Sequence, residues 1–242
     1  MVKSNHLKKQ PEEKGNILHC VGIIMDGNRR WARKRGLPTF EGHRRGYTKL
    51  KEIVLLCKKI DIRNIVVYAF STENWNRSEE EVEYLMNLFR VVLFKEKEWF
   101  KKEKIRVKFV GQREKLASDI GKGVEVLEKE TEKGLHTLYI AVSYGGRAEI
   151  LSAIKKVIRE KKPAEIESME EQDFSRFLWT GDMPDPDFII RTSGEKRLSN
   201  FLPWQSTYSE LFFPRVCWPS FTKEDFLEIV EKYKERKRRK GK

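Results

Sequence analysis

Five short apolar runs, separated by longer stretches with helical patterning, constrain the fold of this chain more than any other feature. They occupy residues 21–25, 65–70, 105–110, 137–142 and 188–190. Near-continuous apolar runs of this length are typical of strands buried on both faces, as in a parallel sheet covered by helices. The 242 residues contain no internal repeat and no long Gly/Ser/Pro linker. The sequence therefore predicts a single α/β domain with a central, mostly parallel β-sheet wrapped by helices.

Charge and polarity divide the chain into three predicted regions. Residues 1–16 are polar and predict a flexible arm, residues 17–231 carry the apolar runs and predict the folded domain, and residues 232–242 form a basic tail. The tail holds eight Lys or Arg and one Glu, a balance of +7 within the net charge of +13. The body is only moderately basic, which weakens the alternative of a nucleic-acid-binding protein. Such a protein would also interleave basic residues with stacking aromatics on one face.

The sequence shows no signal for secretion or for crossing a membrane. Its start is polar and lysine-rich, without the apolar core of a signal peptide. No apolar run approaches the roughly 20 residues that span a bilayer. The cysteines Cys20, Cys57 and Cys217 are widely spaced and form no Cys-x-x-Cys pair. We expect a cytoplasmic protein whose cysteines stay reduced and pack as small apolar side chains.

Three helix starts show capping-box spacing, in which Ser or Thr precedes an acid by three residues. The pairs are Ser78 with Glu81, Ser168 with Glu171, and Thr222 with Asp225. The helix after Ser78 is unusual, because residues 85–94 read LMNLFRVVLF and are apolar almost all the way round. Such a helix either packs in the core on several sides or turns one face to an apolar tunnel between sheet and helices. For the second interpretation the lining candidates are Met86, Phe89, Leu93 and Phe94.

The first apolar run ends in GIIMDGNRRWA, residues 22–32, at the kind of strand end where α/β proteins bind ligands. A helix is expected to begin near Asn28, and its free N–H groups, with Gly27 allowing close approach, would bind a phosphate. Arg30 adds a guanidinium suited to phosphate oxygens. Asp26 would repel a bare phosphate, so its presence calls for a cation between the two. Mg²⁺ fits, because it is commonly held by one or two carboxylates plus substrate phosphates.

Two further strand ends carry related chemistry. The polar groups that follow are Ser71, Asn74 and Arg77 after the second run, and Arg191, Arg197 and Ser199 after the fifth. Two arginines and a hydroxyl after one strand predict a second phosphate or diphosphate pocket. Glu210 is a candidate second carboxylate for the metal. A cluster of acids interrupted by prolines predicts only a loop, and its members are Asp182, Asp185 and Asp187.

Phosphate-type chemistry at three strand ends beside an apolar helix favours a substrate with a diphosphate head and a long hydrocarbon tail. Each buried methylene contributes roughly 0.8 kcal/mol, so a five-carbon unit in a dry tunnel would add several kcal/mol. The two features together predict a polar mouth that opens into an apolar tunnel.

The chain also contains, in order, the motifs MDGNRRWA, EGHRRG, YAFSTENWNRS, YGGRAEI and IIRTSGEKRLSNFLPWQ, the last followed by YSELFF. In these motifs it resembles the cis-prenyltransferase family, which includes undecaprenyl diphosphate synthase, over about residues 19–241. The form MDGNRR is more similar to archaeal or eukaryotic members. The DDxxD motif of trans-prenyltransferases is absent from the sequence, in agreement with this resemblance.

The resemblance implies a function for residues 17–231 as a catalytic domain that works as a homodimer. The family adds isopentenyl diphosphate repeatedly to an allylic diphosphate primer, such as farnesyl or geranylgeranyl diphosphate, and makes a cis double bond each time. The expected product is a long-chain cis-polyprenyl diphosphate, a precursor of lipid glycosyl carriers, and the expected cofactor is Mg²⁺. A prenyl glycerol phosphate acceptor is the alternative within the family.

The resemblance also implies roles for individual residues. The catalytic set is Asp26, Asn28, Ser71 and Asn74, and the metal set is Asp26 and Glu210. The substrate-binding set is Gly27, Arg29, Arg30, Trp31, His43, Trp75, Arg77, Arg191, Arg197, Ser199, Arg239 and Gly241. The base that accepts the proton stays open between Asp26, Asn28 with a water, and the released diphosphate. Arg239 and Gly241 match an RxG motif that in the family reaches the partner subunit's isopentenyl diphosphate site.

Some positions depart from the family pattern. Many bacterial members have Gly at the position of Arg29 and an Arg within residues 38–40, so one allylic phosphate contact is expected to be replaced or lost. Ser143 stands where the family usually has Asn before YGGR. Asp26 and Arg191 are both retained, which argues against an inactive regulatory subunit. The basic tail is either a solvated surface or a contact for anionic lipid headgroups.

Overall fold

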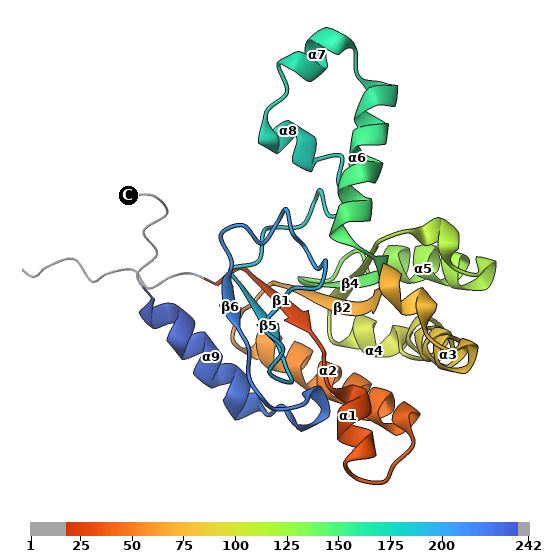
Figure 1. Cartoon of the computed structure of the whole chain (residues 1–242), viewed down its shortest axis with the longest axis vertical. Helices are drawn as coiled ribbons and strands as arrows, with labels where there is room; N and C mark the ends of the chain where they lie inside the picture. Colours follow the sequence, from red (N-terminus) through yellow and green to blue (C-terminus); the bar gives the residue numbers. More distant parts are fainter. Residues whose placement is uncertain (1–17, 237–242) are drawn as a thin grey trace, which may run out of the picture.

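Six strands form one sheet (Figure 1). They are β1 (Cys20–Ile24), β2 (Asn64–Ser71), β3 (Ile105–Val110), β4 (His136–Tyr144), β5 (Phe188–Arg191) and β6 (Glu210–Phe212). Their order is β3-β4-β2-β1-β5-β6, and every neighbouring pair is parallel. This computed structural model describes residues 18–236. The predicted N-terminal segment 1–16, Arg239 and Gly241 therefore lie outside the described residues. The single α/β domain with a parallel sheet confirms the predicted class.

Helices cover one face of the sheet. The α-helices of the described residues are α1 (Asn28–Arg33), α2 (Thr39–Lys59), α3 (Glu79–Lys95), α4 (Lys97–Lys102), α5 (Ser118–Glu130), α6 (Gly146–Glu160), α7 (Pro163–Glu167), α8 (Glu171–Ser175) and α9 (Lys223–Glu235). Side chains of α2 to α5 and α9 form one buried cluster with one face of the strands. The opposite face packs instead against side chains of two irregular segments, Met183 between α8 and β5, and Phe201 and Leu202 between β5 and β6.

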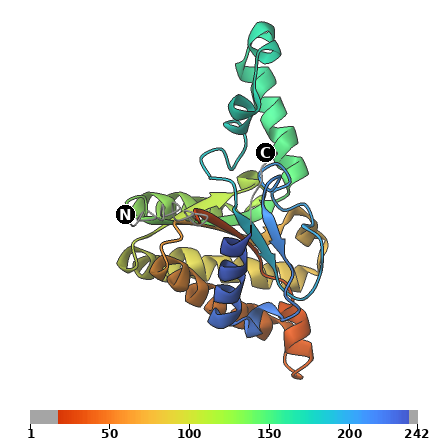
Figure 2. The same ribbon diagram turned by 90° about the vertical axis from the view of Figure 1, so that its left-hand side faces the viewer.

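The segment α6–α8 projects away from the sheet as an arm, as both views of the ribbon show (Figures 1 and 2). Three large apolar side chains of α6 are exposed, namely Leu151, Ile154 and Ile158, with exposed fractions of 58%, 40% and 66%. Their spacing of three and four residues places them along one side of the helix. The arm therefore carries an apolar stripe that nothing in the described part of the chain covers.

All five predicted strands are present, and β2 and β4 extend beyond the apolar runs that predicted them. The edge strand β6 was missed. It has only three residues, Glu210–Phe212, which is too short for a periodicity to be visible. The acids at 182, 185 and 187 lie in the loop before β5, as predicted. Asp187 nevertheless has a structural role, because its carboxylate accepts hydrogen bonds from the N–H groups of His19 and Cys20 and from the hydroxyl of Tyr233.

The three capping-box predictions have different outcomes. Thr222 caps α9, where its hydroxyl accepts a hydrogen bond from Asp225 N at 3.0 Å. Ser78 occupies the N-cap position of α3, but its side chain makes no capping hydrogen bond. The prediction for Ser168 was wrong. Ser168 follows the end of α7, and its hydroxyl donates to the carbonyl of Ala164 at 3.1 Å.

The predicted state of the cysteines agrees with the structure, since all three thiols are free, Cys20 and Cys57 are buried, and Cys217 is half-buried. None of the helices within residues 18–236 combines the length and the apolar character needed to cross a bilayer. The predicted start of the basic tail at 232 falls inside α9, which continues to Glu235.

Substitution of Thr222 by Ala should lower the free energy of unfolding by about 1 kcal/mol, because Asp225 N–H loses its acceptor at the first turn of α9. Ser168→Ala is the matched control, since the exposed Ser168 hydroxyl accepts from no N–H group at a helix start, and it should change stability by less than about 0.5 kcal/mol. Chemical denaturation measures both values. Equal losses in the two variants would contradict the assignment of the cap.

Candidate active site

The carboxyl ends of β1, β2 and β5 surround one pocket of 540 Å³, which we call the strand-end pocket. Eight residues predicted for the site line it, namely Asp26, Asn28, His43, Ser71, Asn74, Arg77, Arg191 and Ser199. The convergence follows from the topology, because β1 has β2 on one side and β5 on the other and the chain therefore reverses its winding direction at β1. Segments more than 160 residues apart in sequence thus meet at one edge of the sheet.

Asp26 and Arg191 form the central contact of the strand-end pocket. Nη2 and Nε of Arg191 donate to Asp26 Oδ2 at 2.9 and 3.3 Å, and Gly27 N donates to Oδ1 at 2.6 Å. Burial raises the pKa of Asp26, but the hydrogen bonds and charge of Arg191, with the Gly27 N–H, outweigh it and hold that pKa below its ordinary value of 3.8. Asp26 is therefore an anion at neutral pH.

Arg191 also organises the loop that follows β5. Its Nη1 donates to the hydroxyl of Ser199 and to the carbonyl of Arg197, each at 2.7 Å. The side chain of Arg191 is only 7% exposed, and its guanidinium bridges Asp26 to this loop. A diphosphate that entered here would meet a cation already oriented by three partners.

The backbone at Gly27 explains why a glycine stands between Asp26 and α1. Gly27 has φ of 97°, in the left-handed region, and an added Cβ would lie 2.8 Å from Ser193 Oγ. Its carbonyl accepts from Trp31 N at 2.8 Å to open the helix. Arg30 follows on the first turn, with ion pairs to Asp26 at 3.4 Å and Glu195 at 3.1 Å. A larger residue at 27 would displace the start of α1.

Glu81 joins the cations on one side of the strand-end pocket, and the sequence analysis treated it only as part of a helix start. Its carboxylate lies 2.7 Å from Arg77 Nη1 and 3.3 Å from Arg29 Nη1. Its position three residues after Ser78 was the only signal in the sequence. Arg29 is thereby held near the pocket, although it does not line it.

His43 is a buried, neutral imidazole between the strand-end pocket and the core. Its Nε2 lies 3.6 Å from Glu81 Oε1, which is too long for a hydrogen bond, and no other described residue pairs with it. Burial, followed by the positive charge of Arg77, lowers the pKa of His43 to about 4. The nitrogen is therefore available to a bound ligand.

The short helix η1 (Thr72–Asn76) places the polar side chains after β2. Asn74 Oδ1 accepts from Ser71 N at 3.1 Å, which closes the turn. Trp75 does not line the pocket. Its indole donates to Ser143 Oγ at 2.9 Å and packs edge-on against Phe70. The structure thus explains Ser143, whose hydroxyl anchors the indole that fixes η1 on the sheet.

Besides the tunnel candidates on α3, seven predicted site residues within residues 18–236 do not line the strand-end pocket, namely Gly27, Arg29, Arg30 and Trp75, and three more that lie apart from it. Trp31 donates from Nε1 to Ser220 Oγ at 2.8 Å, so it attaches α1 to the segment before α9 and does not face the pocket. The side chain of Arg197 is 60% exposed and pairs with Glu195 at 2.5 Å, while its carbonyl contacts Arg191. Glu210 is the third of these residues.

The prediction that Glu210 shares a metal with Asp26 is wrong for a single chain. Glu210 is the first residue of β6 and is in register with Phe188, the first residue of β5. Asp26 follows the last residue of β1, at the opposite end of the parallel strands. Glu210 forms an ion pair with Arg236 instead. The sequence did not predict this position of Glu210, because β6 has only three residues and shows no periodic pattern. Without β6, the sequence does not indicate at which end of the sheet Glu210 lies.

The strand-end pocket nevertheless has a carboxylate suited to a magnesium ion, that of Asp26, whereas both oxygens of the other acid that lines it, Glu73, accept hydrogen bonds from Asn200 and Thr72. Mg²⁺ usually takes one or two protein carboxylates and completes its shell with water and phosphate oxygens. Within residues 18–236 no group of three or more His, Cys, Asp or Glu side chains is placed to hold a metal. The donor set fits a metal that binds together with a diphosphate.

A smaller apolar cavity of 90 Å³ continues inward from the strand-end pocket. The two hollows share the lining residues Met25, Asn28, His43, Ala69 and Leu85. Deeper in, the wall is formed by Tyr47, Leu50, Leu88, Phe89, Val92, Phe100, Leu138 and Ile140. The predicted juxtaposition of a polar mouth and an apolar interior is therefore present.

Of the four tunnel candidates on α3, only Phe89 lines this cavity. Leu93 is buried but faces α5, where it would lie 3.2 Å from a Cβ added at Gly123. Met86 is buried without lining the cavity, and Phe94 is 57% exposed. The cavity face of α3 is instead Leu85, Leu88, Phe89 and Val92, the spacing of one helical face. An all-apolar run does not reveal which side meets the cavity, so the predictions for Met86, Leu93 and Phe94 were wrong.

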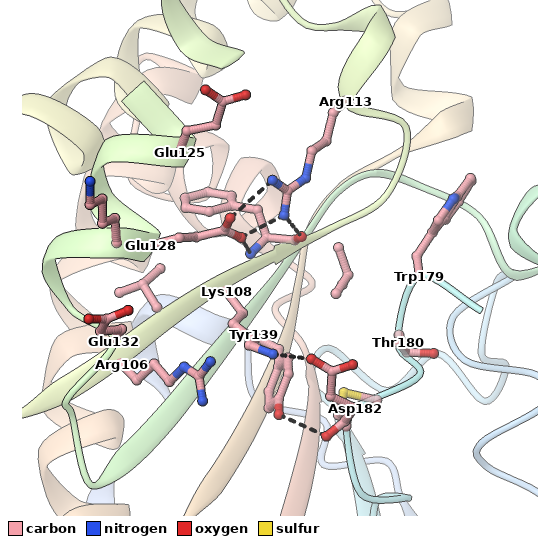
Figure 3. A pocket seen from close by; sticks show the side chains of 15 residues that line it. Arg106, Lys108, Arg113, Glu125, Glu128, Glu132, Tyr139, Trp179, Thr180 and Asp182 are labelled. Carbon is pink, nitrogen blue, oxygen red and sulfur yellow. Dashed lines mark hydrogen bonds and ion pairs between the residues drawn. The ribbon is translucent and has the colours of Figure 1, made fainter. Parts of the chain in front are cut away.

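A second cleft of 440 Å³ lies between β3, α5 and residues 179–183 and shares no lining residue with the strand-end pocket (Figure 3). Several of its charges are paired. Arg113 binds Glu128 at 2.6 Å, Lys108 binds Asp182, and Glu128 Oε1 accepts from Phe109 N at 2.7 Å. These contacts close the free edge of β3 and give the cleft a structural role.

The low pKa of His43 makes stability depend on pH in a predictable direction. The unfolded chain binds the proton near pH 6.5 and the folded chain only near 4. Stability is therefore full above about pH 6.5 and declines as pH falls toward 4, by at most about 1.4 kcal/mol per pH unit. His43→Gln should remove this part of the decline between pH 7.5 and 4.5 in denaturation experiments. An NMR titration that placed the pKa of His43 near 6.5 would contradict the assignment.

Comparisons with known proteins agree with the site. The family model described as putative undecaprenyl diphosphate synthase matches residues 24–241. An isoprenyl transferase of Thermotoga maritima is 48% identical over 91% of this chain and 95% of that protein. A geranylgeranyl-diphosphate-specific tritrans,polycis-undecaprenyl-diphosphate synthase of Thermococcus kodakarensis is 47% identical over 94% and 88%. The crystal structure of lavandulyl diphosphate synthase from Lavandula x intermedia superposes with a TM-score of 0.88 and 30% identity, over 93% of this chain and 98% of that chain. This chain belongs to the cis-prenyltransferase family and is a prenyl diphosphate synthase that elongates prenyl chains.

Proposed function

We propose that the strand-end pocket binds both diphosphates, that Mg²⁺ binds with them at Asp26, and that the growing hydrocarbon enters the adjoining apolar cavity. The observation that carries this proposal is that the two hollows adjoin, since five residues line both of them. A half-buried carboxylate paired with a buried guanidinium at the mouth suits a metal diphosphate, and an apolar wall behind it suits the chain.

Different residues in and around the strand-end pocket bind the two diphosphates. The N–H groups at the start of α1, with Arg30, face the leaving diphosphate of the allylic substrate, and Arg191 with Ser199 binds isopentenyl diphosphate. Bound Mg²⁺ would neutralise charge that grows on the leaving group. Asn28 Oδ1 is buried without a hydrogen-bond partner, so it is suited to hold a water that accepts the proton. Asp26 and the released diphosphate remain the other candidate bases.

Geranylgeranyl diphosphate is the primer that the relatives favour, with farnesyl diphosphate as the second candidate. The names of three relatives, 47%, 42% and 44% identical to this chain, specify geranylgeranyl diphosphate. A prenyl glycerol phosphate is the alternative acceptor within the family, and a primer panel separates the three.

We also propose that the enzyme works as a homodimer in which a second copy covers the apolar stripe of α6. Leu151, Ile154 and Ile158 are exposed on one side of that helix, an arrangement typical of protein–protein contacts. The RxG motif of Arg239 and Gly241 and the proposed contact of the tail with anionic lipid stay predictions, since both fall outside residues 18–236.

Incubation with labelled isopentenyl diphosphate, Mg²⁺ and the primer panel tests the activity. Asp26→Ala should reduce turnover at least about 100-fold, because the metal and Arg191 lose their carboxylate. Asp182→Ala is the matched control, since that acid pairs with Lys108 in the second cleft, and it should stay within about twofold of wild type. Undiminished turnover by Asp26→Ala would refute the proposed metal position.

Chain length should depend on the cavity face of α3. A surface groove between α2 and α3 shares Tyr47 and Leu88 with the cavity, so these two side chains separate the cavity from the surface. Leu88→Ala or Phe89→Ala should shift products to longer chains, because truncation lengthens the apolar path. Phe94→Ala is the control and should leave chain lengths unchanged, as Phe94 is exposed. An identical distribution for all three variants, read by chromatography, would refute the placement of the tail.

A further inference from the structure

Asn200 connects three strand-end loops through one residue. Its Nδ2 donates to Glu73 Oε1 at 3.0 Å, its Oδ1 accepts from Arg147 N at 2.9 Å, and its carbonyl accepts from Gly146 N at 2.8 Å. These partners belong to η1 after β2 and to the start of α6 after β4, while Asn200 itself follows β5.

The backbone at this junction is held in an uncommon conformation. Ser199 and Asn200 have φ of 48° and 66°, in the left-handed region that Asn tolerates better than most residues. Gly145 passes so close that an added Cβ would lie 2.6 Å from Thr72 Oγ1 and 2.7 Å from Asn200 Nδ2. The contact between the loops thus depends on a glycine on one side and an asparagine on the other.

Glu73 is the partner of Asn200 on η1, and both residues line the strand-end pocket. Burial raises the pKa of Glu73, but backbone and side-chain hydrogen bonds, that of Asn200 included, outweigh it and lower the pKa below 4.5. The carboxylate is therefore ionised, and its hydrogen bond with Asn200 is charge-assisted. Such a bond is strong enough to bias the position of a short, five-residue helix.

We propose that Asn200 is a positioning residue that transmits binding of a diphosphate at Arg191 and Ser199 to the catalytic side chains of η1. The proposal rests on the proposed function, because it assumes that isopentenyl diphosphate binds Ser199. A ligand held there fixes the adjacent Asn200, and Asn200 fixes η1 through Glu73. Ser71 and Asn74, which already line the pocket, are then held in place. Binding of isopentenyl diphosphate thus positions the side chains that act on both diphosphate substrates.

Steady-state kinetics on Asn200→Ala, Glu73→Ala and the double variant test the coupling. Each single substitution should raise the KM for isopentenyl diphosphate roughly tenfold, the loss expected for one charge-assisted hydrogen bond. The double variant should be no worse than the poorer single variant, because both remove the same contact. Glu73→Gln keeps an acceptor oxygen and should recover most of the loss. Thr207→Ala, in the same segment but bonded only to the Trp204 carbonyl, is the control and should match wild type.

The fluorescence of Trp75 is a second measurement of the coupling. Its response to the anion would not be lost if Asn200 only stabilised the fold. Titration with inorganic pyrophosphate and Mg²⁺ should change the fluorescence of the wild type, with Trp75→Phe as the background, because η1 settles when the site is filled. In Asn200→Ala the anion should still bind, as shown by calorimetry, but the Trp75 signal should no longer follow it. Retention of the signal, or additive losses in the double variant, would overturn the proposal.

The outcomes separate this proposal from the proposed function. A wild-type enzyme that consumes no isopentenyl diphosphate would refute the function itself, whereas an active wild type with additive single variants refutes only the coupling. If Asn200→Ala does not fold, the Glu73 variants decide the question alone. Recovery by Gln and loss with Ala then support the coupling, and equal activity of the two variants overturns it.

Discussion

The ion pair between Asp26 and Arg191 is the contact on which the rest of the site depends. It joins the ends of β1 and β5, two adjacent parallel strands whose residues are more than 160 positions apart in sequence. The Arg191 side chain is almost fully buried, so loss of Asp26 would leave its charge poorly compensated. The same contact makes the pocket ready for a metal diphosphate, because the carboxylate is ionised and the guanidinium is oriented before any ligand arrives. Structural and catalytic requirements therefore coincide in one pair.

The polar strand-end pocket suits a substrate with a hydrocarbon tail only because an apolar cavity adjoins it. Met25 and Ala69 are shared by the two hollows, and Leu85 begins the face of α3 that continues the wall inward. A hydrocarbon that moved outward from the reacting carbon would expose apolar area to water, whereas movement inward buries it. If the hydrocarbon enters the cavity as proposed, the order of polar and apolar walls sets the direction in which the chain grows. His43 stands at the border, where burial keeps it uncharged and compatible with both sides.

The sequence predicted what depends on local pattern and missed what depends on register. Five strands followed from apolar runs, and the convergence of seven site residues followed from the rule that parallel strands end together, while the eighth, His43 on α2, was predicted only from the family resemblance. The position of Glu210 did not follow from either, since it required a strand of three residues. The cavity face of α3 could not be read from a helix that is apolar all round. Glu81 and Asn200 were missed because their roles are contacts between loops, which no periodicity records.

Differences between exposed parts of the fold indicate where a second copy can bind. The free edge of β3 is closed, because Thr131 Oγ1 accepts from Val107 N and Glu128 Oε1 accepts from Phe109 N. Side chains of α5 and the loop after it thus occupy backbone donors that another strand would otherwise use. The arm of α6 has no such protection, and its apolar stripe remains exposed in the described part of the chain. Burial of that stripe against its own copy would remove apolar surface from water without disturbing the sheet or the strand-end pocket. We therefore expect the proposed homodimer to associate through the arm of α6 rather than through the β3 edge.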